Sequence, residues 1–362
     1  MISPQERKDK LVRATDLDAL SCRFSANNRG YFNTPPDQYI RALITSYQKH
    51  LPFCQGYTQL SSNRTLRSVF QDNQKLPLIN RGTYFRTRSI DLVVNDFISQ
   101  HNGQCQIISI GSGSDTRAFR TLKDSPDVIY HEIDFPESCK IKRAAILEDD
   151  TLRDIIGYKE DSTLTDSITS KEDFQSYPSD LNTDRYYLYG VDLRELEGSK
   201  FSFDLTLPTL VISECVLCYI SLENNARILS FFRDLFKSST IAFLIYEPMS
   251  LNDSFGSTMT ANLSGRGIVL PTFEKLPDLK TRLSFLKECK FLDIKLTDLS
   301  EISGYEGDNS WISPEEIQRI DKLEIIDEIE EIRLLLKHYC LTYAGIGDSF
   351  KSDRKWIISE NY

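Results

Sequence analysis

Two glycines and one acid stand at a spacing that could hold a nucleotide. Gly111 and Gly113 follow the apolar run 107–110, and Asp134 ends the next apolar run, 128–134. Glycine lacks a Cβ, so the chain can turn sharply there and a ligand can touch the main chain. The carboxylate of Asp134 can accept hydrogen bonds from two ribose hydroxyls. A strand, a glycine turn, a helix and an acid-ended strand about 20 residues later are typical of a nucleotide-binding βαβ unit.

The residues around the glycine turn favour S-adenosylmethionine over a dinucleotide. A dinucleotide site expects G-x-G-x-x-G and an uncharged helix start for the pyrophosphate, whereas this turn reads G-S-G-S-D-T. The charge of Asp115 would repel pyrophosphate at the helix start. S-adenosylmethionine has no phosphate and carries a sulfonium cation, so acids near the turn favour it. Because a single G-x-G is weak evidence, a structural turn that binds no ligand remains the alternative.

Further charged residues lie where they could complete such a site. Asp192 and Glu214 come at the ends of two later apolar runs, and ligands of open α/β sheets bind at the carboxyl ends of the strands. Each acid could instead be a helix N-cap, but several at one rim predict a cofactor site. Arg86 and Arg88 precede a helical apolar stripe, so they either face this site or are solvated.

The elements that would position these residues alternate between strands and helices, which predicts a mostly parallel sheet with right-handed crossovers. We expect residues 1–14 to be a disordered tail and 15–362 to form one domain. Within it, 15–101 is a helical lid and substrate region. Residues 102–362 form a Rossmann-like core with a polar insertion at about 149–183. The pattern also predicts a helix from Pro314 toward Ile329, a final strand over 333–343, and a loop-like stretch over 54–76.

Composition narrows the class of protein. The chain has 362 residues, of which 40% are hydrophobic and 27% charged, with a net charge of −10. This acidity argues against a nucleic-acid partner, and no apolar run reaches the length of about 20 residues that a membrane span needs. Eight cysteines without an apolar secretion signal at the N-terminus predict a reduced, cytoplasmic protein. The C-x-x-C at 215–218 lies in an apolar run without a second ligand pair, so we expect no metal site.

Several motifs together resemble those of the leucine carboxyl methyltransferases. They are Gly111–Arg117, Ile133–Pro136, Val191–Leu193, Ile212–Tyr219, Asp18–Arg23, Asn80–Thr87 and His338–Tyr339. The resemblance spans about 18–343. It implies a Rossmann-like class I methyltransferase fold, with a seven-stranded, mostly parallel sheet whose last strand is antiparallel, and an N-terminal helical segment. It also implies that S-adenosylmethionine is used to esterify the C-terminal leucine carboxylate of the protein phosphatase 2A catalytic subunit, which regulates assembly of the phosphatase holoenzyme.

The resemblance also carries over to particular residues. It places cofactor contacts on Arg86, Gly111, Asp134, Asp192, Leu193 and Glu214. Asp134 would bind the ribose, Asp192 with Leu193 the adenine, and Glu214 the ammonium group. Arg86 would bind a carboxylate. Arg23, which stands where lysine is usual, and Tyr219 are the residues expected to position the substrate.

The expected reaction needs no catalytic acid or base in the chain. A C-terminal carboxyl group has a pKa of about 3.3–3.7, so it is already an anion at neutral pH. The enzyme must hold this anion in line with the methyl group and remove water from it. We therefore expect a monomer that binds the tail of the phosphatase, with no nucleic acid and no membrane as partners.

Three other functions remain open. The chain could be a related carboxyl methyltransferase that acts on a tRNA wybutosine precursor, although those proteins usually carry a β-propeller for which 362 residues leave no room. It could act on a small molecule. It could also be a scaffold that binds the phosphatase without transferring a methyl group.

Overall fold

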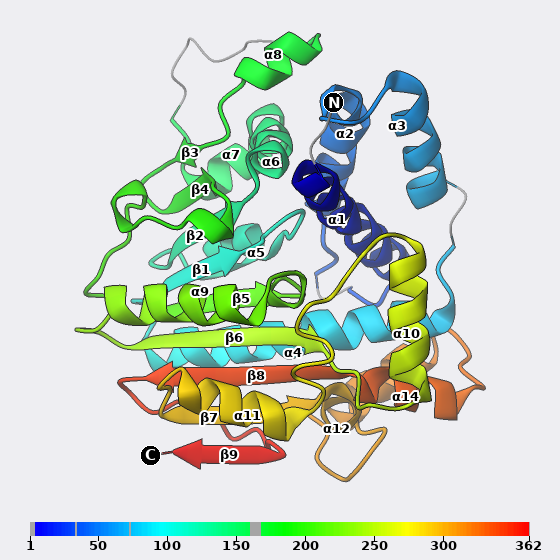
Figure 1. Ribbon diagram of the computed structural model, residues 1–362, viewed down its shortest axis with the longest axis vertical. Coiled ribbons are helices and arrows are strands. Elements are labelled where there is room, and N and C mark those ends of the chain that lie inside the picture. The colour runs from blue at the N-terminus through cyan, green and yellow to red at the C-terminus, as the bar shows by residue number, and fades with distance from the viewer. Residues whose placement is uncertain (1–3, 33–34, 72–73, 160–167, 362) are drawn as a thin grey trace.

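The computed structural model describes residues 4–32, 35–71, 74–159 and 168–361. Figure 1 shows one large mixed sheet with helices on both faces. The strand order is β3-β4-β2-β1-β5-β6-β8-β7-β9. The strands are β1 (Gln106–Ile110), β2 (Ile129–Asp134), β3 (Leu181–Asn182), β4 (Tyr186–Gly190), β5 (Thr209–Glu214), β6 (Ile241–Pro248), β7 (Asp293–Asp298), β8 (Tyr339–Ile346) and β9 (Ile358–Asn361).

Five neighbouring strands, β4, β2, β1, β5 and β6, run parallel, and β8 lies antiparallel between β6 and β7. The predicted α/β class with its antiparallel late strand is confirmed. The expected count of seven strands is two short, because β3 pairs with the edge strand β4 and β9 pairs with the edge strand β7, both antiparallel. These two short strands occupy the edges of an otherwise open sheet.

The helices are α1 (Pro4–Asn28), α2 (Ile40–His50), α3 (Gln59–Leu66), α4 (Pro77–Gln100), α5 (Arg117–Asp124), α6 (Pro136–Glu148), α7 (Asp150–Ile156), α8 (Lys171–Ser176), α9 (Leu222–Leu235), α10 (Ser254–Gly265), α11 (Leu279–Glu288), α12 (Leu299–Ser303), α13 (Pro314–Asp321) and α14 (Ile329–Lys337). One apolar core joins the sheet to α4 and α5, and a second joins it to α9 and α11. Because the central strands are covered on both faces, β1 and β6 are buried throughout, as parallel strands usually are.

The register of the central strands brings the predicted site residues together. Ile110 at the end of β1 pairs with Ile133 of β2 and Ser213 of β5. The next residue of each strand or turn is then Gly111, Asp134 or Glu214. The carboxyl ends of these three strands therefore meet at one edge of the sheet.

The N-terminal prediction is wrong. Helix α1 begins at Pro4, where a disordered tail was expected over 1–14, and it continues without a break through Thr15. The hydroxyl of Thr15 donates to the carbonyl oxygen of Val12 at 2.6 Å. Ion pairs with the core hold the first half of this helix, since Arg13 contacts Glu137 at 2.9 Å. Such contacts with distant residues leave no local pattern in the sequence. Residues 1–3 lie outside the described residues.

The C-terminal prediction needs the same kind of correction. The apolar run 333–343, predicted as one strand, is the second half of α14 followed by the start of β8, and α13 ends at Asp321. Ile332 and Leu336 are buried four residues apart on one helix face. A short apolar run does not distinguish a buried helix from a strand by its pattern. The stretch 54–76 contains α3, and 149–183 contains α7 and α8, with 160–167 outside the described residues.

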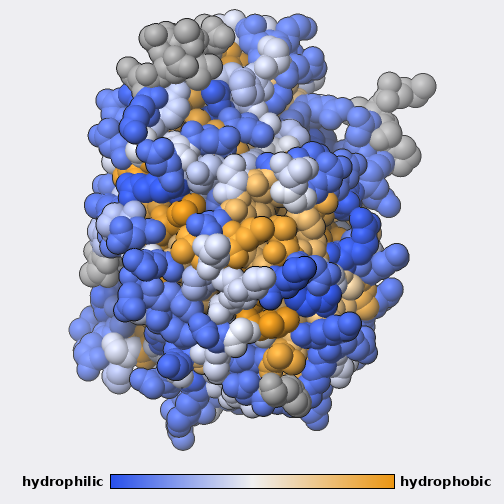
Figure 2. Space-filling model, turned by 90° about the vertical axis from the view of Figure 1, so that its left-hand side faces the viewer, coloured by the Kyte–Doolittle hydropathy of each residue, from blue (hydrophilic) through white to orange (hydrophobic). Residues whose placement is uncertain are grey.

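Among the helices within the described ranges, none has the length and hydropathy that crossing a bilayer requires. Figure 2 shows a mostly hydrophilic surface on the face at the left of Figure 1, with an apolar area at its middle height.

A buried ion pair supports the sheet beneath the glycine turn. Lys142 of α6 contacts Glu132 of β2 at 2.7 Å, and its side chain also donates to the carbonyl oxygen of Asp115 at 2.7 Å. Both side chains of the pair are at most 2% exposed, and burial raises the pKa of Glu132. We predict that Lys142→Met lowers the free energy of unfolding by about 3–5 kcal/mol, because it leaves a buried carboxylate without its cation.

Chemical denaturation measures this effect. The double variant Lys142→Met/Glu132→Gln is the control, and it should recover part of the loss because the uncompensated charge is gone. A Lys142→Met variant as stable as the wild type would contradict the assignment.

Candidate active site

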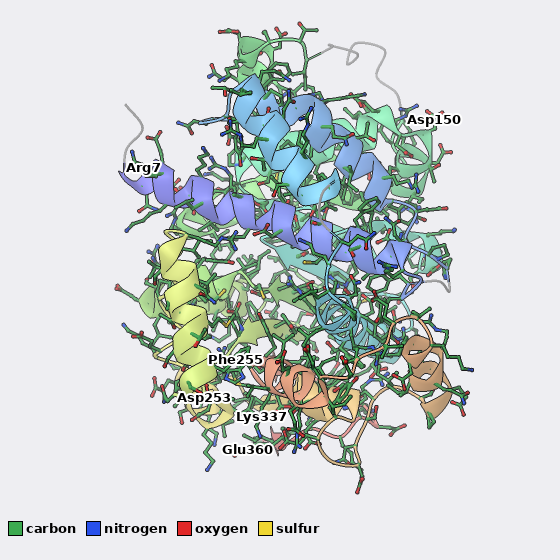
Figure 3. All side chains as sticks on the ribbon, turned by 90° about the vertical axis from the view of Figure 1, so that its right-hand side faces the viewer. Arg7, Asp150, Asp253, Phe255, Lys337 and Glu360 are labelled. Atoms are coloured by element: carbon green, nitrogen blue, oxygen red, sulfur yellow. The ribbon has the colours of Figure 1, made fainter. Side chains whose placement is uncertain are left out.

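A cavity of about 820 Å³ lies between α1 and the carboxyl ends of the strands. Figure 3 shows α1 lying across this end of the molecule, with α2 and α3 above it and α10 below. The volume falls within the usual range of ligand pockets. All eight residues predicted from the sequence line this one cavity: Arg23, Arg86, Gly111, Asp134, Asp192, Leu193, Glu214 and Tyr219.

The glycine turn forms the floor of the cavity. Gly111 and Gly113 have φ angles of +60° and +44°, which side chains rarely allow. A Cβ added to Gly111 would lie 2.4 Å from Cγ2 of Val216, so this position cannot accept a larger residue without a shift. Asp134 closes the turn from β2, because its two oxygens accept the backbone N–H groups of Gly113 and Phe135, each at 2.6 Å. Each oxygen keeps a further lone pair for a ligand hydroxyl.

Asp16 of α1 joins the cover of the cavity to its floor, and the sequence reasoning missed it. Its Oδ1 accepts hydrogen bonds from the backbone N–H of Ser114 at 2.8 Å and from the Ser114 hydroxyl at 2.7 Å. The hydroxyl of Tyr47 donates to its other oxygen. Asp16 and Arg23 are seven residues apart and so share one helix face. A helix prediction extended through this segment would have revealed a charged face.

The pKa of Asp134 depends on its burial and on the neighbouring Asp16. Burial raises its pKa to about 6, and the negative charge of Asp16 adds to the increase. The two backbone N–H groups act in the opposite direction. Asp134 is therefore a carboxylate that donors of a bound ligand would stabilise further.

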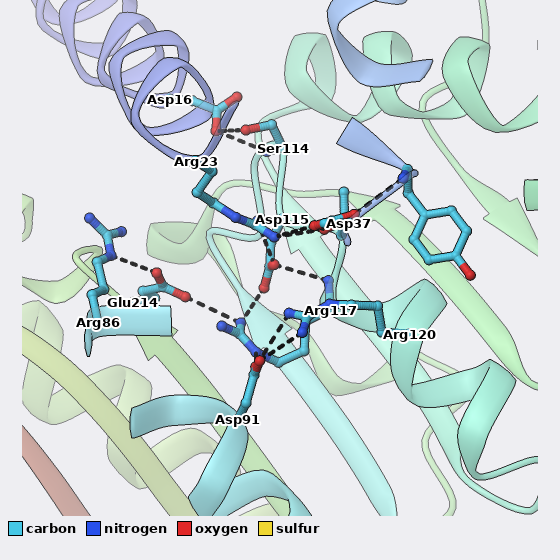
Figure 4. Close-up of polar contacts among 12 residues, drawn as sticks. Asp16, Arg23, Asp37, Arg86, Asp91, Ser114, Asp115, Arg117, Arg120 and Glu214 are labelled. Atoms are coloured by element: carbon cyan, nitrogen blue, oxygen red, sulfur yellow. Dashed lines mark hydrogen bonds and ion pairs between the residues drawn. The ribbon is translucent and has the colours of Figure 1, made fainter. Parts of the chain in front are cut away.

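Four arginines and four acids form a network beside the turn (Figure 4). Glu214 lies between two of the arginines: Nε of Arg86 contacts its Oε1 at 2.6 Å, and a guanidinium nitrogen of Arg117 contacts its Oε2 at 3.2 Å. Arg117 also contacts Asp91 of α4 at 2.7 Å, and only 3% of its side chain is exposed. Arg117 therefore ties α4 to the end of β5. It stands two residues after Asp115 in the G-S-G-S-D-T-R motif, where an arginine so close to an acid could have signalled the pairing.

Arg86 presents unused donors to the cavity. Its Nε is bonded to Glu214, whereas its two Nη atoms have no hydrogen-bond partner in the part of the chain that the structure describes, and Figure 4 shows them directed away from Glu214. The guanidinium lies 5.2 Å from the ring centroid of Tyr246, which stacks on Tyr339. The two Nη atoms are free to bind a planar anion such as a carboxylate through two hydrogen bonds. The alternative of a solvated arginine fits Arg88, which is exposed.

Arg23 is held more tightly than the sequence suggested. Its guanidinium contacts Asp115 and Asp37, each at 2.9 Å, and donates to the hydroxyl of Thr116 at 2.6 Å. Asp115 is also paired with Arg117. These guanidinium groups hold the pKa of Asp115 well below its usual range. Asp115 is thus a compensated charge, and the repulsion of pyrophosphate that the sequence argument assigned to it is weakened.

Asp192 and Tyr219 line the cavity from the loops that follow β4 and β5. Asp192 accepts hydrogen bonds from the backbone and side chain of Arg194, both at 2.9 Å, at the start of the 3₁₀ turn Leu193–Glu195. Arg194 reaches Asp9 of α1 at 2.9 Å. Tyr219 lies in the loop after β5, where burial raises the pKa of its hydroxyl.

The thiols of Cys215 and Cys218 behave as interior groups. Both residues line the cavity, and burial raises the pKa of Cys215 to about 12. Within the described ranges, no group of three or more His, Cys, Asp or Glu side chains is arranged to hold a metal ion.

Comparison with known proteins gives one family. The family model described as leucine carboxyl methyltransferase matches residues 12–233. A Debaryomyces hansenii protein named leucine carboxyl methyltransferase 1 is 55% identical over 370 residues, covering 98% of this chain and 99% of its own. A Candida albicans protein of the same name is 54% identical over 372 residues, covering 99% and 100%. A solved duf574 family protein from Streptomyces avermitilis is 11% identical, with a TM-score of 0.47 and coverage of 84% and 96%.

The contacts of Asp134 predict its titration. Its carboxyl group should titrate with a pKa of about 6 in the free protein, measured by carbon NMR. The Asp16→Asn variant should bring this pKa closer to the usual 3.8, because it removes the neighbouring negative charge.

The same shift affects stability. Because the folded pKa exceeds the unfolded one, the contribution of Asp134 to stability is complete below about pH 4 and is lost as the pH rises through about 6. A wild-type midpoint near 3.8 would contradict this description of the site.

Proposed function

The chain belongs to the leucine carboxyl methyltransferase family, and from this we propose that it methylates the C-terminal leucine carboxylate of the protein phosphatase 2A catalytic subunit. It is an S-adenosylmethionine-dependent enzyme with the α/β fold of a methyltransferase. The observation that best supports the proposed reaction is Arg86. It is a cation fixed by Glu214 with two free Nη groups, and it lies in the same cavity as the glycine turn and Asp134.

The residues of the cavity fit S-adenosylmethionine. Asp134 has lone pairs available for two ribose hydroxyls, and Gly111 leaves room for close approach. Asp192 and the backbone of Leu193 would contact the adenine from the neighbouring strand end. Glu214 would bind the ammonium group of the cofactor's methionine part, and the Nη atoms of Arg86 would bind its carboxylate. The Arg86–Glu214 ion pair would therefore bind both charged groups of this amino acid.

Methyl transfer then depends on how the cofactor and the substrate carboxylate are positioned relative to each other. The bound cofactor supplies a methyl group on a sulfonium centre. The substrate carboxylate is already ionised at neutral pH, so no residue of the chain has to accept a proton. Helix α1 covers the cavity and limits access of water to the carboxylate. Tyr219 and Arg23 would position the substrate, Arg23 through the rigid set of ion pairs that it makes with Asp37 and Asp115.

We also propose that helix α1 acts as a lid over the cavity. Asp9, Arg13, Asp16 and Arg23 each bond from α1 to the sheet domain across the cavity. Cofactor and substrate would enter beside this helix, and we propose that 15–101, together with the first turns of α1, forms the lid and substrate region.

The role of Arg86 gives a direct prediction. Arg86→Met should raise the dissociation constant for S-adenosylmethionine roughly 10- to 150-fold, because charge-assisted hydrogen bonds contribute about 1.5–3 kcal/mol. Isothermal titration calorimetry measures this constant. The matched control is Arg88→Met, which removes an exposed arginine two residues away on the same helix and should leave the affinity unchanged. Equal affinities for the two variants would rule out the role of Arg86.

The proposed substrate is tested by methyl transfer. With labelled S-adenosylmethionine and purified phosphatase 2A catalytic subunit, we expect base-labile label on the wild-type subunit and none on a subunit lacking its final leucine. Cofactor binding without any methyl transfer would contradict the assignment of this subunit as the substrate. Label on both subunits would place the methyl group on another residue.

A further inference from the structure

The loop that follows β5 forms a wall between two cavities. Val216, Cys218 and Tyr219 line the large cavity, whereas Leu217 lines a second, small cavity of about 30 Å³ behind the loop. The loop starts at Cys215, whose φ of +55° is unusual for a residue with a side chain. Val216 packs against Gly111 on the cofactor side. The position of this loop therefore shapes the glycine turn and the space beside it.

Two buried polar side chains hold the loop from behind. Glu247, near the end of β6, accepts the backbone N–H of Val216 on its Oε1 at 3.1 Å. Asn225 of α9 donates from Nδ2 to the carbonyl oxygen of Leu217 at 3.0 Å. Glu247 is 1% exposed and Asn225 is 2% exposed. Each side chain uses one polar atom to bind the loop, and its second polar atom, Oε2 of Glu247 or Oδ1 of Asn225, is not bonded to the loop.

The remaining polar atoms belong to residues that line the small cavity. Four buried atoms of these residues make no hydrogen bond to a nitrogen or oxygen atom within the described residues: Oε2 of Glu247, Oδ1 of Asn225, Nε of Arg282 and Oγ1 of Thr342. The thiol of Cys218 lies beside Glu247 and that of Cys340 beside Thr342, and thiols are weak hydrogen-bond partners. Arg282 and Glu247 are close enough that the guanidinium lowers the pKa of the carboxyl, opposing the larger effect of burial, but they form no direct ion pair. Unsatisfied buried polar groups are costly, so four of them around one cavity point to a shared partner.

We propose that the small cavity binds one structural water molecule that joins Glu247, Asn225, Arg282 and Thr342 behind the active-site loop. The four atoms match the bonding capacity of water. Glu247 Oε2 and Asn225 Oδ1 accept its two hydrogens, while the Nε–H of Arg282 and the hydroxyl of Thr342 donate to its oxygen. A cavity of about 30 Å³ is large enough for one water and too small for a larger ligand.

The water makes Glu247 and Asn225 positioning residues for the cofactor site. It fixes the free ends of both side chains to α11 through Arg282 and to β8 through Thr342. The two side chains then hold the backbone of Val216 and Leu217 in place against the glycine turn. This effect on cofactor affinity rests on the proposed function, whereas the water itself does not.

The first test is a crystal structure of the wild-type protein at a resolution that shows ordered water. We expect one peak in the small cavity within hydrogen-bond distance of all four atoms. An empty cavity would overturn the proposal, whatever the protein does with the cofactor.

The second test compares two variants of Thr342. Thr342→Val keeps the shape of the side chain and removes the hydroxyl, and it should weaken binding of S-adenosylmethionine roughly two- to tenfold. Thr342→Ser keeps the hydroxyl and should bind as the wild type does. Both are compared well below their melting temperatures. If a water is present but valine and serine bind the cofactor equally, the positioning role is overturned. Wild type that does not bind S-adenosylmethionine would contradict the proposed function instead.

Discussion

The pairing of Glu214 with two arginines is the interaction on which the site depends. Glu214 ends β5, and each of its two oxygens accepts from one arginine, Oε1 from Arg86 and Oε2 from Arg117, which leaves a lone pair on each for a ligand donor. Arg117 is buried and carries the contact on to Asp91 of α4, so the charges are fixed before any ligand binds. Such an arrangement costs little reorganisation during binding. It also leaves the free side of Arg86 as the place where a ligand carboxylate can add to the network.

The sequence predicts the structure correctly where local pattern and parallel-sheet geometry decide it. The strand ends at Gly111, Asp134 and Glu214 were found because buried parallel strands are continuous apolar runs that end at one edge of the sheet. That Arg23, Arg86 and Tyr219 line the same cavity was anticipated only through the family resemblance. Nothing in their own surroundings fixes the direction of their side chains.

The features that were missed depend on contacts between distant parts of the chain. Helix α1 continues through 4–14 and is anchored by Asp9, Arg13 and Asp16, whose partners lie far away in the sequence. The run 333–343 divides into helix and strand because of the packing around Ile332 and Leu336. Asp115 looked like an isolated charge, yet Arg23 and Arg117 neutralise it. Sequence pattern shows which residues are charged, but only the fold shows which charges meet.

The central claim is that Arg86 binds a ligand carboxylate while Glu214 keeps its orientation. A crystal structure of the complex with S-adenosylhomocysteine tests it most directly. The account predicts that both Nη atoms of Arg86 lie within hydrogen-bond distance of the ligand carboxylate, that Nε stays on Glu214, and that Asp134 contacts the ribose hydroxyls. A ligand carboxylate bound elsewhere, or an Arg86 side chain turned away from Glu214, would contradict it.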